Sequence, residues 1–173
     1  MAYSSYCEMP KATKPTTRES QFLPPSTFII DNGACSIKAG FAPSRPLADT
    51  DTLNQCRAIP NSLVRTRDKR IYVASQQNDI SQWSEATFRR PVERGHLVNW
   101  EAEKEIWEHS FFDQKTAHQT LLLKNPEDTT LILTEAPNAM HALQRNADEI
   151  IMEEWGFGGY ARVVGGYDQR RSL

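Results

Sequence analysis

The residues best placed to do chemistry lie close together, within the stretch 28–41. Asp31 ends an apolar run, Asn32-Gly33 is a dipeptide typical of tight hairpin turns, and Lys38 follows five residues later. A turn of this kind directs backbone N–H groups to one side, where they can hold phosphate oxygens beside a lysine. A carboxylate at the strand end can hold hydrated Mg²⁺. The pattern indicates half of a nucleotide site; an ordinary hairpin with one exposed lysine is the alternative.

Several strands must surround this turn. The sequence predicts two strands within 28–41, a strand at 57–60 that ends at its proline, and a short strand at 71–74. Residues 88–98 are expected to be mostly extended, with a turn at Arg94-Gly95. The segment 62–70 is polar and basic, so it is expected to be exposed. Its cationic side chains are interpreted as a solvated loop, and they are Arg65, Arg67, Lys69 and Arg70.

A helix is expected after Asn99, which is a good N-cap residue. Glu101 and Glu103 fall in its first turn, where the helix dipole favours negative charge. Large apolar side chains recur along one face, and that face is expected to be core, with a partner site as the alternative. They are Trp100, Ile106, Trp107 and Phe111.

The apolar run 129–134 predicts a parallel strand buried on both faces. A second helix is expected to begin at Pro137-Asn138 and to stop at Gly156. Its apolar residues at helical spacing are Met140, Leu143, Ala147, Ile150 and Ile151. A further strand is expected to begin at Val163. Strand–helix alternation of this kind indicates an α/β fold with a mixed sheet.

The two ends of the chain lack such patterns. Residues 1–26 are rich in Ser, Thr, Pro and Lys and are expected to be a disordered leader, with a transit peptide as the lesser alternative. Residues 165–173 lose the apolar pattern altogether. This abrupt change suggests a truncated product or a wrongly assigned gene end, although a natural short isoform is also compatible. The folded part is expected to span 27–164.

Composition narrows the class of protein. The chain has 173 residues, with 39% hydrophobic, 24% charged and a net charge of −2, which suits a soluble domain and not an electrostatic DNA-binding surface. The cysteines are Cys7, Cys35 and Cys56, without disulfide or zinc spacing, and Cys35 is interpreted as a small packing residue. No apolar run has the length of a membrane span, and no signal-peptide core is present.

Five motifs occur in order between residues 28 and 164. They are Asp-Asn-Gly with Lys-Ala-Gly-Phe at 31–41; Arg-Ala-Ile-Pro-Asn at 57–61; Tyr72-Val73 with Arg-Pro-Val-Glu-Arg-Gly-His-Leu-Val-Asn-Trp at 90–100; Glu-Ile-Trp-Glu-His-Ser-Phe at 105–111; and Leu-Thr-Glu-Ala-Pro at 133–137. The series resembles the actin family. The segments 97–100 and 153–157 resemble its nuclear actin-related class numbered six, a subunit of the chromatin remodeller that exchanges a histone variant.

This resemblance implies an actin-like (ribonuclease-H-like) ATPase fold, of which the chain would carry the first half and the start of the small inserted subdomain. It also implies site residues. Asp31 would lie near the hydrated metal, and Lys38 would approach the β-phosphate. The turn residues that would bring backbone groups to the phosphates are Asn32, Gly33, Ala34, Cys35 and Ser36.

Two departures weaken the expected phosphate contacts. Ala34 stands where conventional actins have a serine whose hydroxyl senses the terminal phosphate, and Cys35 replaces a glycine. The lost hydroxyl contact would be worth roughly 1.5–3 kcal/mol. The second phosphate hairpin, the catalytic glutamine and the adenine pocket of the family have no counterpart here. We therefore expect no ATP hydrolysis, and ATP or ADP with Mg²⁺ would be held tightly only in a longer protein.

The expected function is a non-motor scaffold subunit of the nuclear histone-exchange remodeller. Its partners would be other protein subunits and histones, with no sequence-specific nucleic acid and no membrane. The protein would be located in the nucleus, and an additional cytoplasmic location is an alternative. Alternatives are a conventional filament-forming actin ATPase, a sugar kinase or chaperone of the same superfamily, and a non-functional fragment. The segment 90–100, typical of actins, argues against the kinase and the chaperone.

Overall fold

The computed structural model describes residues 26–43 and 56–165. The expected leader and tail therefore lie outside the described residues, except for Ser26 and Gly165. Within the described part, no helix combines the length and the apolar character that crossing a membrane requires.

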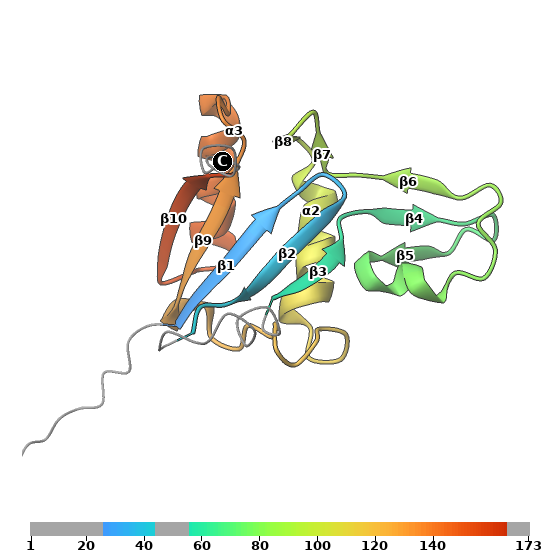
Figure 1. Cartoon of the computed structure of the whole chain (residues 1–173), viewed down its shortest axis with the longest axis horizontal. Helices are drawn as coiled ribbons and strands as arrows, with labels where there is room; N and C mark the ends of the chain where they lie inside the picture. Colours follow the sequence, from blue (N-terminus) through green and yellow to red (C-terminus); the bar gives the residue numbers. More distant parts are fainter. Residues whose placement is uncertain (1–25, 44–55, 166–173) are drawn as a thin grey trace, which may run out of the picture.

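A five-stranded mixed sheet forms the centre of the fold (Figure 1). Its order is β10 (Gly159–Val164), β9 (Thr129–Glu135), β1 (Ser26–Asn32), β2 (Ser36–Phe41) and β3 (Arg57–Pro60). β1 and β2 are antiparallel and place Asp31 opposite Lys38. β9 lies parallel to both β1 and β10. The predicted α/β class, the hairpin and the strand 57–60 are confirmed.

Two helices cover one face of this sheet. α2 (Trp100–Trp107) continues into the π-helical turn η2 (Glu108–Phe112), and α3 (His141–Glu149) continues into the π-helical turn η4 (Ile150–Glu154). A short 3₁₀ turn, η3 (Pro126–Asp128), precedes β9. The side chain of Asn99 accepts a hydrogen bond from the Ala102 N–H at 3.1 Å, so the predicted N-cap is confirmed.

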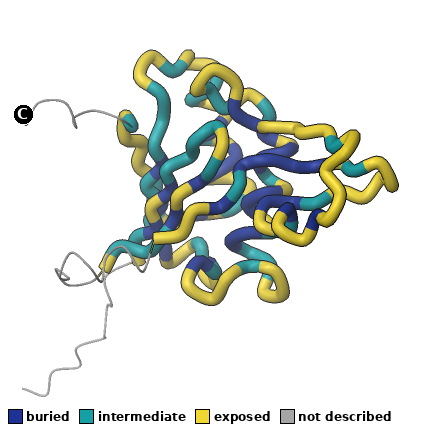
Figure 2. Tube along the Cα trace, turned by 45° about the vertical axis from the view of Figure 1, so that its right-hand side comes forward, coloured by how far each residue is buried: buried dark blue, intermediate teal, exposed yellow. Residues whose placement is uncertain are grey.

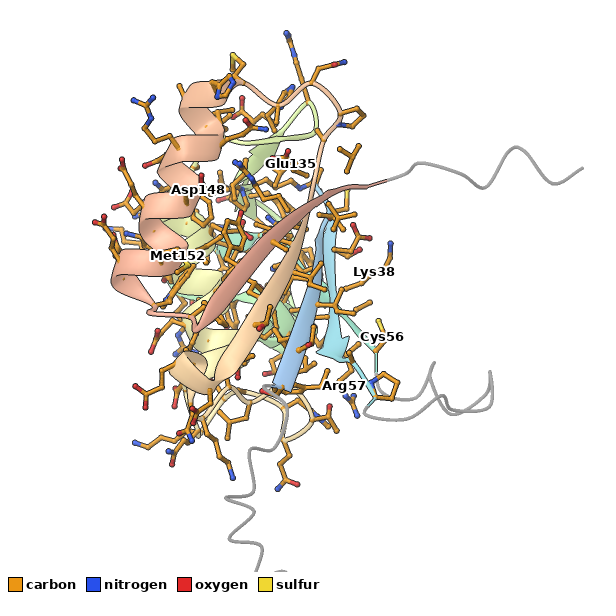
Figure 3. The ribbon with its side chains drawn as sticks, turned by 90° about the vertical axis from the view of Figure 1, so that its left-hand side faces the viewer. Lys38, Cys56, Arg57, Glu135, Asp148 and Met152 are labelled. Carbon is orange, nitrogen blue, oxygen red and sulfur yellow. The ribbon has the colours of Figure 1, made fainter. Side chains whose placement is uncertain are left out.

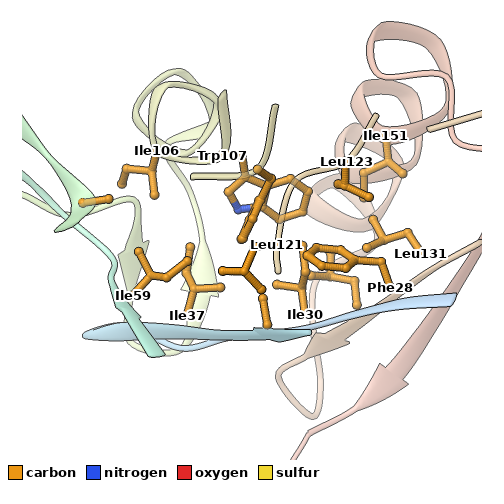
Figure 4. Close-up of a cluster of buried hydrophobic side chains, with 14 of the residues drawn as sticks. Phe28, Ile30, Ile37, Ile59, Ile106, Trp107, Leu121, Leu123, Leu131 and Ile151 are labelled. Carbon is orange, nitrogen blue, oxygen red and sulfur yellow. The ribbon is translucent and has the colours of Figure 1, made fainter. Parts of the chain in front are cut away.

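The core lies between these helices and the sheet. Trp107 is fully buried at its centre, among side chains from β1, β2 and β3 and from the connection before β9 (Figure 4). Its ring stacks on Trp155 with 4.7 Å between centroids. The aromatic face of α2 is therefore core, as predicted, and burial of such large side chains supplies much of the driving force for folding.

The opposite face of the sheet is open, and no described helix covers it (Figures 1 and 2). Ile29 is 39% exposed and Val163 is 49% exposed there. β9 accordingly alternates between buried and half-buried residues. The prediction that 129–134 is buried on both faces is thus wrong, because only the helix side of the sheet is covered in the described structure.

A smaller three-stranded sheet extends from β3. Its order is β5 (Ile71–Val73), β4 (Leu63–Arg65) and β6 (Thr87–Arg89), with the 3₁₀ helix η1 (Ala74–Asp79) after β5. The segment 62–70 was predicted to be exposed, which is wrong for Ser62, Leu63 and Val64. Leu63 and Val64 are buried because they pair with β5 and β6 and pack inward. The four basic residues of this segment are exposed, as expected.

Four local predictions concern turns and element ends. The turn at Arg94-Gly95 is confirmed, since both residues have positive φ, between β7 (Val92–Glu93) and β8 (His96–Leu97). The second helix begins at His141 and not at Pro137, because Asn138 has φ 68° and cannot be helical. The last strand begins at Gly159, so Val163 lies near its end. Gly156, with φ 63°, marks the predicted stop after η4.

Candidate nucleotide-phosphate site

The hairpin turn between β1 and β2 consists of Gly33, Ala34 and Cys35. The Gly33 N–H donates to the Asp31 carbonyl at 3.2 Å. A Cβ at Gly33 would lie 2.7 Å from the Ser36 carbonyl oxygen. Glycine is therefore needed here for space. Neither Asn32 nor Gly33 has positive φ, so the conformation that usually explains an Asn-Gly turn is not used.

The backbone of this turn is available to a ligand. Within the described residues, the N–H groups of Ala34 and Cys35 have no hydrogen-bond acceptor. Neighbouring free N–H groups at a turn form a concave donor site that suits an anion. Ser36 lies at the start of β2 and is half-buried. The expected phosphate contacts are thus compatible with the geometry at Ala34 and Cys35.

Asp31 and Lys38 form an ion pair beside the turn. Lys38 Nζ lies 3.1 Å from Asp31 Oδ2, and the two side chains are 58% and 46% exposed. Lys38 lies on the side of the sheet opposite α3 (Figure 3). Because the pair is exposed, it contributes little to stability, and the ammonium group is free to turn towards a phosphate.

Thr134, at the carboxyl end of β9, holds the other oxygen of Asp31. Its hydroxyl donates to Asp31 Oδ1 at 2.8 Å and accepts the Asn32 N–H at 3.2 Å. This short chain of hydrogen bonds fixes the carboxylate at the edge of the turn. Asp31 is a single carboxylate, and the described residues contain no group of three or more His, Cys, Asp or Glu that could hold a metal. It therefore suits a cation that keeps its water shell.

A pocket of about 270 Å³ opens at the carboxyl ends of β1 and β9, below α3 and beside the β7–β8 hairpin. The end of β1 contributes Asp31 and Asn32 to its wall, and the turn contributes Gly33 and Ala34. Ligands of α/β proteins commonly bind at this end of parallel strands. Cys35, Ser36 and Lys38 do not line the pocket.

The far wall of the pocket carries polar groups from β10 and α2. Arg162 Nη1 lies 3.4 Å from Asp148 Oδ1. The Tyr160 hydroxyl and the Trp100 indole N–H are buried and have no hydrogen-bond partner among the described residues. Burial raises the pKa of Tyr160, so this group remains a neutral donor. Arg162 and Tyr160 were not predicted from the sequence to lie at a site, and Trp100 was predicted as a core residue.

The structure also brings Asn61 and Glu103 against the turn, and neither was predicted to act there. Glu103 had a usable signal: it comes three residues after Trp100 and four before Trp107, which places it on the buried helix face. Thr134 could have been inferred from the parallel pairing, because it follows Leu133, which pairs with Ile30, and so lies next to Asp31. Asn61 ends the motif at 57–61, which does not by itself indicate a contact with the turn.

Cys35 does not have the packing role expected for it. Its side chain is exposed, because the turn projects from the end of the hairpin. The sulfur therefore crowds the approach to the turn and not the core. Ala34 has no side-chain hydroxyl, so only its backbone N–H could contact a phosphate at this position.

Comparison with known proteins agrees with the fold. The actin family profile matches residues 23–166. The chain is 54% identical over 164 residues to the actin-like protein arp6 of Aspergillus fumigatus, covering 89% of this chain and 35% of that protein. It is 58% identical over 157 residues to the actin-like protein arp6 of Emericella nidulans, covering 88% and 33%.

A third relative is the actin-related protein 6 of Neurospora crassa, 47% identical over 142 residues, with 82% of this chain and 30% of that protein covered. The chain thus spans about a third of the length of these curated relatives. The fold, the ordered motifs and these similarities together show that the chain belongs to the actin family, as an actin-related protein.

Proposed function

We propose that this chain is part of a non-motor scaffold subunit of a nuclear chromatin-remodelling complex that exchanges a histone variant. Its hairpin turn binds the phosphates of ATP or ADP with Mg²⁺, and the bound nucleotide is structural. The proposal is supported by membership of the actin family and by similarity to actin-related proteins of class six.

The observation that carries the binding role is the arrangement at the turn. The free N–H groups of Ala34 and Cys35 lie at the end of the hairpin that bears Lys38. When a phosphate occupies this position, Lys38 exchanges its exposed partner Asp31 for the ligand. Asp31, still held by Thr134, is then free to bind the water shell of Mg²⁺.

Hydrolysis is not part of the proposal, because phosphoryl transfer needs charged and positioning groups on both sides of the nucleotide. The turn supplies one side. The hydroxyl that conventional actins place near the terminal phosphate is absent at Ala34. Binding by this chain alone is therefore weak and discriminates poorly between ATP and ADP.

The scaffold role depends on protein surfaces. A net charge of −2 does not favour a dominant contact with DNA. The open sheet face, with Ile29 and Val163 exposed, is the kind of apolar surface that is covered by another protein segment. Partner subunits and histones are therefore the expected contacts. The expected location is the nucleus, and an additional cytoplasmic location remains an alternative.

Affinity purification of the tagged chain from its own cells tests the scaffold role. We expect to recover the motor subunit of a histone-exchange remodeller in a constant ratio to the tagged chain. Absence of this motor subunit would contradict the assignment to a remodeller. The purified chain should not hydrolyse Mg·ATP above the rate of a Lys38→Ala control. Turnover together with pelleting above a threshold concentration would instead indicate a conventional filament-forming actin.

A further inference from the structure

Glu103 is a fully buried carboxyl group whose neighbours include the side chains of Asn32 and Asn61, beside the phosphate turn. It lies on the inner face of α2, where the Trp107 Nε1–H donates to its Oε1 at 2.7 Å. Its second oxygen, Oε2, has no hydrogen-bond partner among the described residues. A buried carboxylate oxygen without a partner is strongly unfavourable. The structure therefore requires another way to satisfy this atom.

Asn61 connects the same region to the turn. Its Nδ2 group donates to the Gly33 carbonyl at 3.0 Å and lies 3.4 Å from Asn32 Oδ1, and its backbone N–H donates to the Cys35 carbonyl at 3.0 Å. Asn61 thus holds both ends of the turn. Its own Oδ1 is buried and has no partner in the described structure, and the amides of Asn61 and Asn32 face the Glu103 carboxyl.

One proton resolves both unsatisfied atoms. A protonated Oε2 donates to Asn61 Oδ1, which leaves the Asn61 Nδ2 group free to hold the Gly33 carbonyl. We propose that Glu103 is a positioning residue for the phosphate turn, acting as a neutral acid that fixes the orientation of the Asn61 amide. If the carboxyl ionises, it needs a donor, and rotation of the Asn61 amide supplies one at the expense of Gly33.

The electrostatic setting agrees with this geometry. Burial raises the pKa of Glu103 to about 7, and the Trp107 indole and the nearby amides of Asn32 and Asn61 oppose this rise. No charged side chain contributes to this shift.

The charged and titratable groups on the surrounding elements form ion pairs with other residues or are at least partly exposed to solvent. They are the paired Asp31 and Lys38 on the hairpin, Lys104 paired with Glu154, Glu101 paired with Arg89, exposed Glu105 on α2, exposed Glu93 on β7 and half-buried His96 on β8. The orientation of the turn should therefore change near neutral pH.

Nuclear magnetic resonance of the full chain between about pH 5 and pH 8.5 tests this directly. The amide signals of Gly33 and Ala34 and the side-chain NH₂ of Asn61 should shift together with a midpoint near 7. In Glu103→Gln, whose amide donates as the acid does, these signals should stay at their low-pH positions. The controls Glu105→Gln and His96→Gln should keep the wild-type midpoint.

A midpoint that persists in Glu103→Gln would overturn the proposal. The wild-type chain provides a second test that needs no variant to fold: the Glu103 side-chain carboxyl carbon should titrate near 7, and a value close to the ordinary 4.5 would also overturn it. The titration of Glu103 does not depend on nucleotide binding. Only its effect on phosphate binding at the turn rests on the proposed function. Failure of Mg·ADP to bind would refute that function and leave the titration result standing.

Discussion

Replacing Thr134 by valine removes one hydroxyl without changing the shape of the side chain. The hydroxyl makes two hydrogen bonds, at 2.8 Å to Asp31 Oδ1 and at 3.2 Å from the Asn32 N–H. A bond to a charged group is worth up to about 3 kcal/mol, but water reaches the half-exposed Asp31 and replaces part of it. We expect a loss of about 1–2 kcal/mol in the free energy of unfolding, or about 3–6 °C in Tm for a chain of this size.

Urea unfolding and thermal melting measure this change. Thr130→Val is the matched control, because Thr130 lies on the same strand and its hydroxyl has no hydrogen bond among the described residues. It should change the free energy of unfolding by less than about 0.5 kcal/mol. Equal effects of the two substitutions would refute the view that Thr134 fixes Asp31 at the turn.

Three further changes have distinct outcomes. Lys38→Ala should alter unfolding by no more than about 0.5 kcal/mol, since its ion pair with Asp31 is exposed, yet it should abolish Mg·ADP binding measured by calorimetry. Asn99→Ala removes the helix cap and should cost about 1 kcal/mol in urea unfolding. For Glu103, the pKa is raised from 4.5 to about 7, so wild-type stability should fall as pH rises between these values, by about 3 kcal/mol, and level off above. Glu103→Gln should lack this fall, and a wild-type profile that rises over this range would contradict the buried neutral acid.

Local signals predicted much of the fold. The β1–β2 hairpin, the strand ended by Pro60 and the helix capped by Asn99 each depend on contacts within a few residues, and all are present. The parallel pairing of β9 followed from its apolar composition. The hairpin turn and the helix cap are determined by neighbouring residues, whereas the pairing of β9 with β1 joins residues far apart in the sequence.

Predictions that depend on contacts between residues far apart in the sequence were less accurate. Val64 looked like part of a basic loop, and only its neighbours on β5 and β6 bury it. The start of α3 was missed because Asn138 adopts positive φ, which sequence seldom reveals. At the site, Asp31 and the turn were predicted. Asn61 was not, because its role arises from a contact 28 residues away in sequence.

The central claim is that the turn holds nucleotide phosphates through its backbone and Lys38. Titration of the full chain with Mg·ADP, followed by amide chemical shifts, tests it most directly. The account predicts saturable shifts centred on Gly33, Ala34 and Cys35, and their loss in Lys38→Ala. Shifts confined to other parts of the chain, or equal shifts in Lys38→Ala, would contradict it.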